Sequence, residues 1–286
     1  MTALFALATS LLWGLADFGG GLLTRRTPAL TVVVVSQAIA AAVLGAIMLA
    51  TGGLSEAGPQ LWFAFAAGLV GPIALLSFYK ALALGPMGVV SPLATLSVAV
   101  PVGVGLFLGE RPGLLQVAGI AVAVGGVVLA GGPQLKGAPV QRQAILLTLI
   151  AAMGFGTVFA LIAEASSTVT GLFLALFVQR VTNVAVGGAA LCAAVRRGSS
   201  ALPESGTFPW ASLPALAFVG LADVAANGTY SVAAQHGPVT VAAVLASLYP
   251  VVTSLAARGF LRERLRAVQA AGAGLALVGT VLLATG

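Results

Sequence analysis

Hydrophobic residues fill almost the whole chain in ten long runs, separated by short polar segments or by Gly-Pro pairs. About 20 consecutive apolar residues cross a bilayer as a helix, so each run predicts one transmembrane helix. A strand would alternate apolar and polar residues, which these runs do not, and a backbone in lipid must satisfy its polar groups within its own segment. The predicted spans are residues 3–23, 29–50, 61–84, 87–108 and 113–131 in the first half, and 143–163, 171–195, 210–235, 239–260 and 266–285 in the second.

The composition agrees with a membrane protein. Hydrophobic residues make up 59% of the 286 residues, charged residues only 7%, and the mean hydropathy is +1.10, whereas a soluble domain carries about 25% charged residues. The net charge of +6 does not point to nucleic acid, because the basic residues lie at the predicted membrane edges, where they set orientation. The lipid bilayer is therefore the first expected partner.

The two halves of the chain resemble each other in sequence. Residues 79–86 (YKALALGP) match residues 230–238 (YSVAAQHGP), and residues 93–96 (LATL) match residues 245–248 (LASL). Because each half contains five spans, an odd number, the second copy is inverted in the membrane relative to the first. We therefore expect an all-α membrane protein of ten transmembrane helices, built as two inverted five-helix repeats.

Basic residues are distributed unequally between the two sides of the membrane in this predicted topology. Ten of the thirteen Lys and Arg residues fall on one side, and only Arg111 lies on the other. The positive-inside rule then puts the connections after spans 1, 5, 7 and 9 in the cytoplasm and both termini outside, in the inner (plasma) membrane of a cell. We expect the first repeat at residues 1–132, a linker at 133–142 and the second repeat at 143–286.

Several short motifs occur at residues 12–14 (LWG), 79–86, 108–111 (LGER), 247–250 (SLYP) and 261–264 (LRER), and the segments 79–86 and 108–111 align with 230–238 and 261–264 of the second repeat. With these motifs the chain resembles the drug/metabolite transporter superfamily, specifically its ten-helix EamA-type branch, over essentially its full length. The resemblance implies a helical basket with a central cavity, alternating access, and small metabolites as substrates, with amino-acid export common in bacterial members. Many members are drawn with cytoplasmic termini, and the charge distribution departs from that picture.

Four ionisable residues lie inside predicted spans: Asp17, Lys80, Arg180 and Asp223. Each costs about 2.5 kcal/mol or more at the centre of an isolated helix, so each must face protein or water. Opposite charges at similar depth reduce each other's burial cost, and we expect Asp17 to pair with Lys80 and Arg180 with Asp223. Such pairs can bind a substrate, or they can serve only to lock helices together, with Lys80 reaching toward the interface.

Further polar and aromatic residues fall at similar depth. Span 8 carries Asp223, Asn227 and Tyr230 on one helix face, and the repeat alignment pairs Gln37 with Gln179 and Tyr79 with Tyr230. These groups either line a cavity at the membrane midplane or only bond neighbouring helices, and the aromatic rings either form its apolar walls or pack in the core. The candidate substrate-binding residues are Trp13, Asp17, Gln37, Phe78, Tyr79, Lys80, Phe155, Phe159, Gln179, Arg180, Asn183, Asp223, Asn227 and Tyr230.

These residues predict a secondary transporter, and the resemblance favours one that exports amino acids, aromatic or otherwise small and zwitterionic. Efflux of cationic drugs or of another small metabolite is the alternative, and it would favour an unpaired carboxylate within an aromatic cage. An intramembrane enzyme is a remote alternative, because no nucleophile and base are paired inside a span. One histidine and one cysteine make no metal site, and we expect no cofactor. Proton coupling through Asp17 or Asp223, and a monomeric or dimeric state, stay open.

Overall fold

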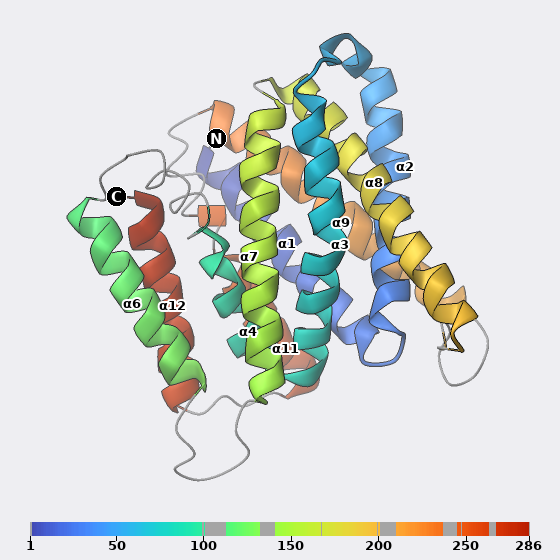
Figure 1. Cartoon of the computed structure of the whole chain (residues 1–286). Helices are drawn as coiled ribbons and strands as arrows, with labels where there is room; N and C mark the ends of the chain where they lie inside the picture. Colours follow the sequence, from blue (N-terminus) through green and yellow to red (C-terminus); the bar gives the residue numbers. More distant parts are fainter. Residues whose placement is uncertain are drawn as a thin grey trace.

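The computed structural model describes residues 2–98, 100, 113–131, 141–166, 168–198, 200, 210–236, 245–246, 248–262 and 267–285. Throughout those ranges the regular structure is helical and contains no strand (Figure 1). The start of the first helix and the end of the last lie at the same end of the bundle, as an even number of crossings requires. The expected all-α class is confirmed.

The helices of the first half agree with the predicted spans to within about two residues wherever both are described. Pro86 ends the third helix, because Gly85 before it is extended and donates its N–H to the Ala81 carbonyl. The fourth helix continues as a 3-10 turn, and the rest of the predicted span 87–108 lies outside the described residues. The elements are α1 (Thr2–Thr24), α2 (Ala29–Ala50), η1 (Gly53–Glu56), α3 (Leu61–Leu84), α4 (Met87–Ala94), η2 (Thr95–Val98) and α6 (Leu114–Gly131).

The second half repeats this order of helices. The Thr168 hydroxyl caps α8 by accepting the Gly171 N–H at 3.0 Å, and a proline near the first position starts both α9 and α11. The predicted residues 239–244 of span 9 lie outside the described ranges. The elements are α7 (Arg142–Ala165), α8 (Val169–Arg196), η3 (Trp210–Ser212), α9 (Leu213–Gln235), α11 (Tyr249–Leu261) and α12 (Ala267–Thr285).

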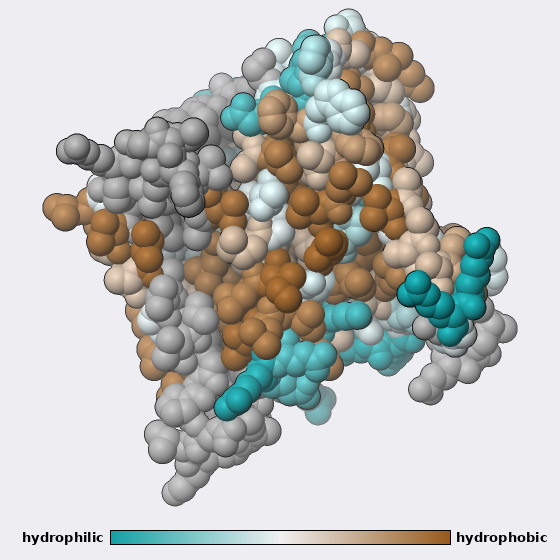
Figure 2. Space-filling model, in the orientation of Figure 1, coloured by the Kyte–Doolittle hydropathy of each residue, from teal (hydrophilic) through white to brown (hydrophobic). Residues whose placement is uncertain are grey.

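The surface of the bundle suits lipid. Among the described residues, six helices are long and apolar enough to cross a membrane, and two shorter apolar helices accompany them. Apolar side chains cover the middle of the surface in Figure 2, and hydrophilic ones gather toward its ends. The exposed arginines lie at helix ends, as Arg25, Arg142 and Arg196 show. The chain is therefore a multi-pass membrane protein.

The helix contacts have the symmetry of two repeats. In the repeat correspondence, α1, α2, α3, α4 and α6 of the first half match α7, α8, α9, α11 and α12 of the second. The contact between α1 and α9 then has its counterpart in the contact between α3 and α7. Likewise, the contact between α1 and α11 has its counterpart in the contact between α4 and α7. The pairs α2 with α8, α4 with α11, and α6 with α12 are their own counterparts, and all three form. This pattern, together with the five spans in each half, confirms two inverted five-helix repeats.

Glycines allow the closest of these helix contacts. A Cβ on Gly14 of α1 would lie 2.6 Å from the Tyr249 carbonyl oxygen of α11, and one on Gly220 of α9 would lie 2.4 Å from the Ser36 carbonyl oxygen of α2. No larger residue fits there without moving a backbone. Small residues at such contacts are the usual means by which membrane helices pack, since lipid offers little hydrophobic driving force.

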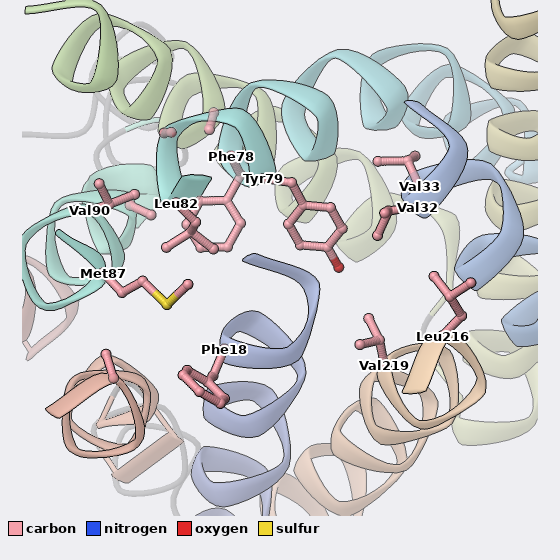
Figure 3. Packing of buried hydrophobic residues seen from close by; sticks show 14 residues of the cluster. Phe18, Val32, Val33, Phe78, Tyr79, Leu82, Met87, Val90, Leu216 and Val219 are labelled. Atoms are coloured by element: carbon pink, nitrogen blue, oxygen red, sulfur yellow. The ribbon is translucent and has the colours of Figure 1, made fainter. Parts of the chain in front are cut away.

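The largest buried cluster fills one end of the bundle. Most of its members come from the end of α1, the start of α2, the end of α3, α4 and the start of α9, and Ala151 of α7 and Ala257 of α11 join them. Figure 3 shows the Phe78 and Tyr79 rings side by side above Phe18, with Met87 beside them. This end of the bundle is closed by apolar packing.

Candidate functional site

A cavity of about 690 Å³ lies between the two repeats. Its volume falls in the range of about 300–1,000 Å³ that is usual for small-molecule sites. All the candidate residues from the sequence except Lys80 and Asn183 line it, namely Trp13, Asp17, Gln37, Phe78, Tyr79, Phe155, Phe159, Gln179, Arg180, Asp223, Asn227 and Tyr230. The structure therefore brings these residues together, and their role in binding stays a prediction.

A network of hydrogen bonds joins both repeats at the wall of this cavity. Arg180 of α8 forms an ion pair with Asp223 of α9 and donates to the side-chain oxygen of Gln37 on α2. The indole N–H of Trp13 on α1 donates to Asp223 Oδ1 at 3.2 Å, and the Asn227 amide donates to the Asp223 carbonyl oxygen at 2.8 Å. The predicted pairing of Arg180 with Asp223 is present, and it connects four helices.

Asn183 lies behind this network and does not line the cavity. Its side chain is 1% exposed, and its amide donates to the Gln37 oxygen at 3.3 Å. Three buried polar atoms on this part of α8 have no hydrogen-bond partner among the residues that the structure describes: Gln179 Oε1, Arg180 Nε and Asn183 Oδ1. Asn183 thus positions Gln37, and through Gln37 it supports Arg180.

Asp17 lines the cavity, and among the described residues it has no hydrogen bond and no ion pair. It lies one helical turn after Trp13 on the same face of α1, which is about 6 Å along the helix axis. Since Trp13 contacts Asp223, the two carboxylates share one region of the cavity. The expected pairing of Asp17 with Lys80 is wrong.

Lys80 lies on the opposite face of α3, away from the cavity. It is exposed, and Ile73 and Leu84, seven residues before it and four after it, are exposed on the same face. A lysine in that position extends its apolar stem along the lipid and its ammonium toward the headgroups. The alternative role for Lys80, reaching toward the membrane interface, is therefore the one that its position supports.

Aromatic rings form two walls of the cavity. The Trp13 ring lies 6.1 Å from the Tyr230 ring and 6.2 Å from the Tyr249 ring, measured between centroids. On the other wall, Phe78 and Phe155 meet edge to face at 5.4 Å. Both sets are within the distances at which aromatic rings interact favourably, so the walls are apolar and rigid around the charged groups.

Seven residues with hydroxyl groups line the cavity and were not predicted from the sequence: Thr95, Ser97, Ser166, Thr168, Ser231, Tyr249 and Thr280. A signal was available for two of them. In the match between residues 93–96 and 245–248, the next position in each copy is Ser97 and Tyr249, so the two residues are repeat-related and belong together. Thr280 had no such signal, because its contact with Thr95, at 2.9 Å between hydroxyl oxygens, joins residues far apart in the chain.

Among the described residues, the two ends of the cavity differ. Its lining extends to Ser166, Thr168 and Val169 at the connection between α7 and α8. At the other end, the buried cluster around Phe18 and Phe78 closes it. The described lining thus extends toward the side opposite the arginine-rich helix ends.

The charges of the cavity decide what it can bind. Two carboxylates, Asp17 and Asp223, face a single guanidinium, Arg180, so the cavity has one excess negative charge when all three groups are ionised. Among the described residues no group of three His, Cys, Asp or Glu could hold a metal ion.

Comparison with known proteins agrees with this architecture. A solved structure, described only as "Crystal structure of protein", matches with a TM-score of 0.60 and 22% identity over 99% of this chain and 97% of that one, a likeness that concerns the fold. Comparison with curated proteins finds no match. The model of the EamA-like transporter family matches residues 1–132 and 142–285. This chain therefore belongs to the EamA-like transporter family, within the drug/metabolite transporter superfamily, and is a membrane transporter of small molecules.

Proposed function

We propose that this chain is a secondary transporter that exports small organic molecules carrying an ammonium group on an apolar body, amino acids first among them, by alternating access across the inner membrane. The observation that carries the proposal is Asp17, a carboxylate in the cavity with no partner among the described residues. A buried charge without a partner is expensive, so a cationic group of the substrate is its natural counterpart.

The surroundings of Asp17 support an ammonium group at this position. Trp13 lies one turn away on the same helix, and Tyr249 contacts Trp13 at 6.2 Å. The Tyr79 ring lies against Gly20, three residues after Asp17. The faces of Trp and Tyr rings attract cations, by about 0.5–2 kcal/mol each depending on desolvation, so these rings add to the attraction of the carboxylate.

An amino acid would direct its carboxylate toward Arg180, a residue that is 8% exposed and whose guanidinium has five N–H donors. The rings of Phe78, Phe155 and Phe159 would then hold the side chain. This arrangement separates the two charges of a zwitterion between α1 and α8, and it uses both repeats for one substrate.

Export of cationic amines that lack a carboxylate is the second candidate, and a specific observation favours it. Arg180 is already paired with Asp223 and Gln37, and a substrate with one net positive charge would neutralise the cavity, whereas a zwitterion would leave it negative. The two candidates differ only in whether the substrate needs a carboxylate.

Coupling to protons follows from the same residue. Asp17 binds either a proton or the substrate ammonium, because both neutralise the same carboxylate, and the two therefore compete. We expect substrate efflux from proteoliposomes to accelerate when a pH gradient drives protons the opposite way. Flux that is indifferent to the gradient would reject the coupling and leave facilitated diffusion.

Three compounds with one aromatic body test the substrate class: phenylalanine, phenylethylamine and 3-phenylpropionate. In proteoliposomes, uptake of phenylalanine and phenylethylamine and exclusion of 3-phenylpropionate would support an ammonium-directed site. Phenylalanine alone would favour the zwitterion, and phenylethylamine alone the cation. Transport of 3-phenylpropionate in preference to both would refute the proposal.

Asp17→Asn tests the residue itself. We expect a fall of at least tenfold in transport of every accepted substrate, because a charged hydrogen bond of about 1.5–3 kcal/mol is lost, with partial activity in Asp17→Glu. Lys80→Gln is the matched control, since it removes an intramembrane charge that lies outside the cavity, and it should transport normally. Full activity of Asp17→Asn would remove Asp17 from the site.

A further inference from the structure

A second cavity, of about 360 Å³, lies at the arginine-rich end of the bundle. It is lined by Arg25 after α1, residues 83–86 at the joint of α3 and α4, and Leu261 at the end of α11. The large apolar cluster around Phe18 and Phe78 separates it from the transport cavity. The transporter mechanism proposed above does not use this second cavity.

The cavity is basic on one side. Arg25 lines it, Arg26 follows directly, and Arg258 and Arg262 flank Leu261 on the chain. All four arginines are exposed, and none of them forms an ion pair within the described residues. Arg262 is held at the end of α11 with φ of 54°, in the left-handed region. One arginine thus lines the cavity and three more lie close to its lining residues in the sequence, all four without an acidic partner in the described part of the chain.

The opposite side of the cavity offers hydrogen-bond acceptors. Pro86 has no N–H, so the end of α3 cannot be satisfied by the chain that follows. Gly85 donates to the Ala81 carbonyl. Ala83 and Leu84 are lining residues of the cavity, and within the described residues their carbonyls accept no hydrogen bond from a backbone N–H. A ligand for this cavity must therefore combine an anionic group with O–H or N–H donors.

The apolar surface beside the cavity indicates where such a ligand comes from. Phe260 is 81% exposed and Leu84 is 39% exposed, and both lie at the ends of membrane helices. An anionic headgroup in the cavity would leave its acyl chains against this surface, and basic pockets at the cytoplasmic side of membrane helices are suited to such lipids.

We propose that this cavity binds the headgroup of an anionic phospholipid of the phosphatidylglycerol type. The phosphate contacts Arg25, and the glycerol hydroxyls donate to the free carbonyls of Ala83 and Leu84. The headgroup thereby lies against the Gly85-Pro86 joint that connects α3 to α4. Phosphatidylcholine does not fit, because its headgroup is zwitterionic and has no O–H or N–H donor.

The test titrates the purified full chain in detergent with phosphatidylglycerol or phosphatidylcholine and counts retained lipids by native mass spectrometry. We expect retention of phosphatidylglycerol only, and competition by soluble glycerol 3-phosphate. Equal retention of both lipids would overturn the proposal. Competition by inorganic phosphate as strong as that by glycerol 3-phosphate would also overturn it, since the site would then recognise a bare anion. These arms need no variant.

Variants then assign the site to Arg25. Arg25→Gln should weaken retention of phosphatidylglycerol about fivefold or more, and Arg25→Lys, which keeps the charge, should largely preserve it. Arg196→Gln is the matched control, because Arg196 is an exposed arginine at a helix end that does not line this cavity. Equal losses in Arg25→Gln and Arg196→Gln would show general attraction at the membrane edge and would refute the site.

Discussion

The ion pair between Arg180 and Asp223 gives the sharpest stability prediction. The Arg180 side chain is 9% exposed and that of Asp223 is 24% exposed, so the pair is largely withdrawn from water. Breaking a buried pair by removing one partner costs about 3–5 kcal/mol, because the remaining charge is uncompensated. The two single substitutions should differ, however, since the residues left behind differ in their other contacts.

The contacts set the order of the two effects. After Arg180→Met, Asp223 keeps the hydrogen bond from the Trp13 indole at 3.2 Å and some solvent, so we expect a loss of about 2–3 kcal/mol. After Asp223→Asn, Arg180 stays charged and keeps, within the described ranges, Gln37 as its hydrogen-bond partner, and the loss should approach about 4 kcal/mol. The double substitution should lose about 2 kcal/mol less than the sum of the two.

The measurement is the free energy of unfolding in mixed micelles titrated with sodium dodecyl sulfate, for the wild type, both single variants and the double variant. A second cycle of Arg180→Met with Asp17→Asn is the control, because Asp17 forms no hydrogen bond to Arg180 in the described residues. Additivity of the Arg180 and Asp223 effects to within about 0.5 kcal/mol would refute the network, as would a larger loss for Arg180→Met than for Asp223→Asn.

Two further predictions concern packing and substrate binding. Gly220→Ala should destabilise the protein by about 1–3 kcal/mol, because the added Cβ would lie 2.4 Å from a carbonyl oxygen of α2. Gly188 has open space around it, so Gly188→Ala should leave the free energy of unfolding unchanged in the same titration. Equal effects of the two substitutions would contradict the close contact at Gly220. A protein carrying Trp62→Phe and Trp210→Phe keeps one tryptophan, Trp13, which lines the cavity. Accepted substrates should therefore change the tryptophan fluorescence in a saturable way. An unchanged signal at saturating substrate would remove Trp13 from the site.

Most of the fold follows from the sequence because lipid allows so few solutions. Hydrophobic runs of bilayer length can only be helices, and the boundary at Pro86 comes from a residue whose backbone chemistry is fixed. The contacts between helices were harder to predict from the sequence. Which face of α9 approaches α2 depends on Gly220, and in a chain with 37 glycines one more small residue gives no signal.

The part of the candidate site that could be predicted from the sequence is the pairing of opposite charges inside the membrane. A buried guanidinium and a buried carboxylate at similar depth must pair, and Arg180 with Asp223 does. Depth alone failed for Asp17 and Lys80, because the distance along the helix axis does not say which face a residue occupies. The period of α3 contains that information: Ile73, Lys80 and Leu84 share one face, and an apolar face is the lipid face. Tyr249 was missed because its neighbours in the sequence are apolar, and only its repeat partner Ser97 indicates the cavity.

The repeats are symmetric in their helix contacts but not in their chemistry, and this difference shapes the mechanism. The connection between α7 and α8, which the cavity reaches at Ser166, corresponds to the connection between α1 and α2, which is sealed by Phe18 and its neighbours. If the two repeats exchange conformations, the sealed and open ends exchange as well. The carboxylate of Asp17 occurs in the first repeat only, so both states must present this one group to the substrate. In the proposed transport cycle, access would alternate around this single position, and the residues that differ between the repeats, rather than the shared fold, would determine which molecule is carried.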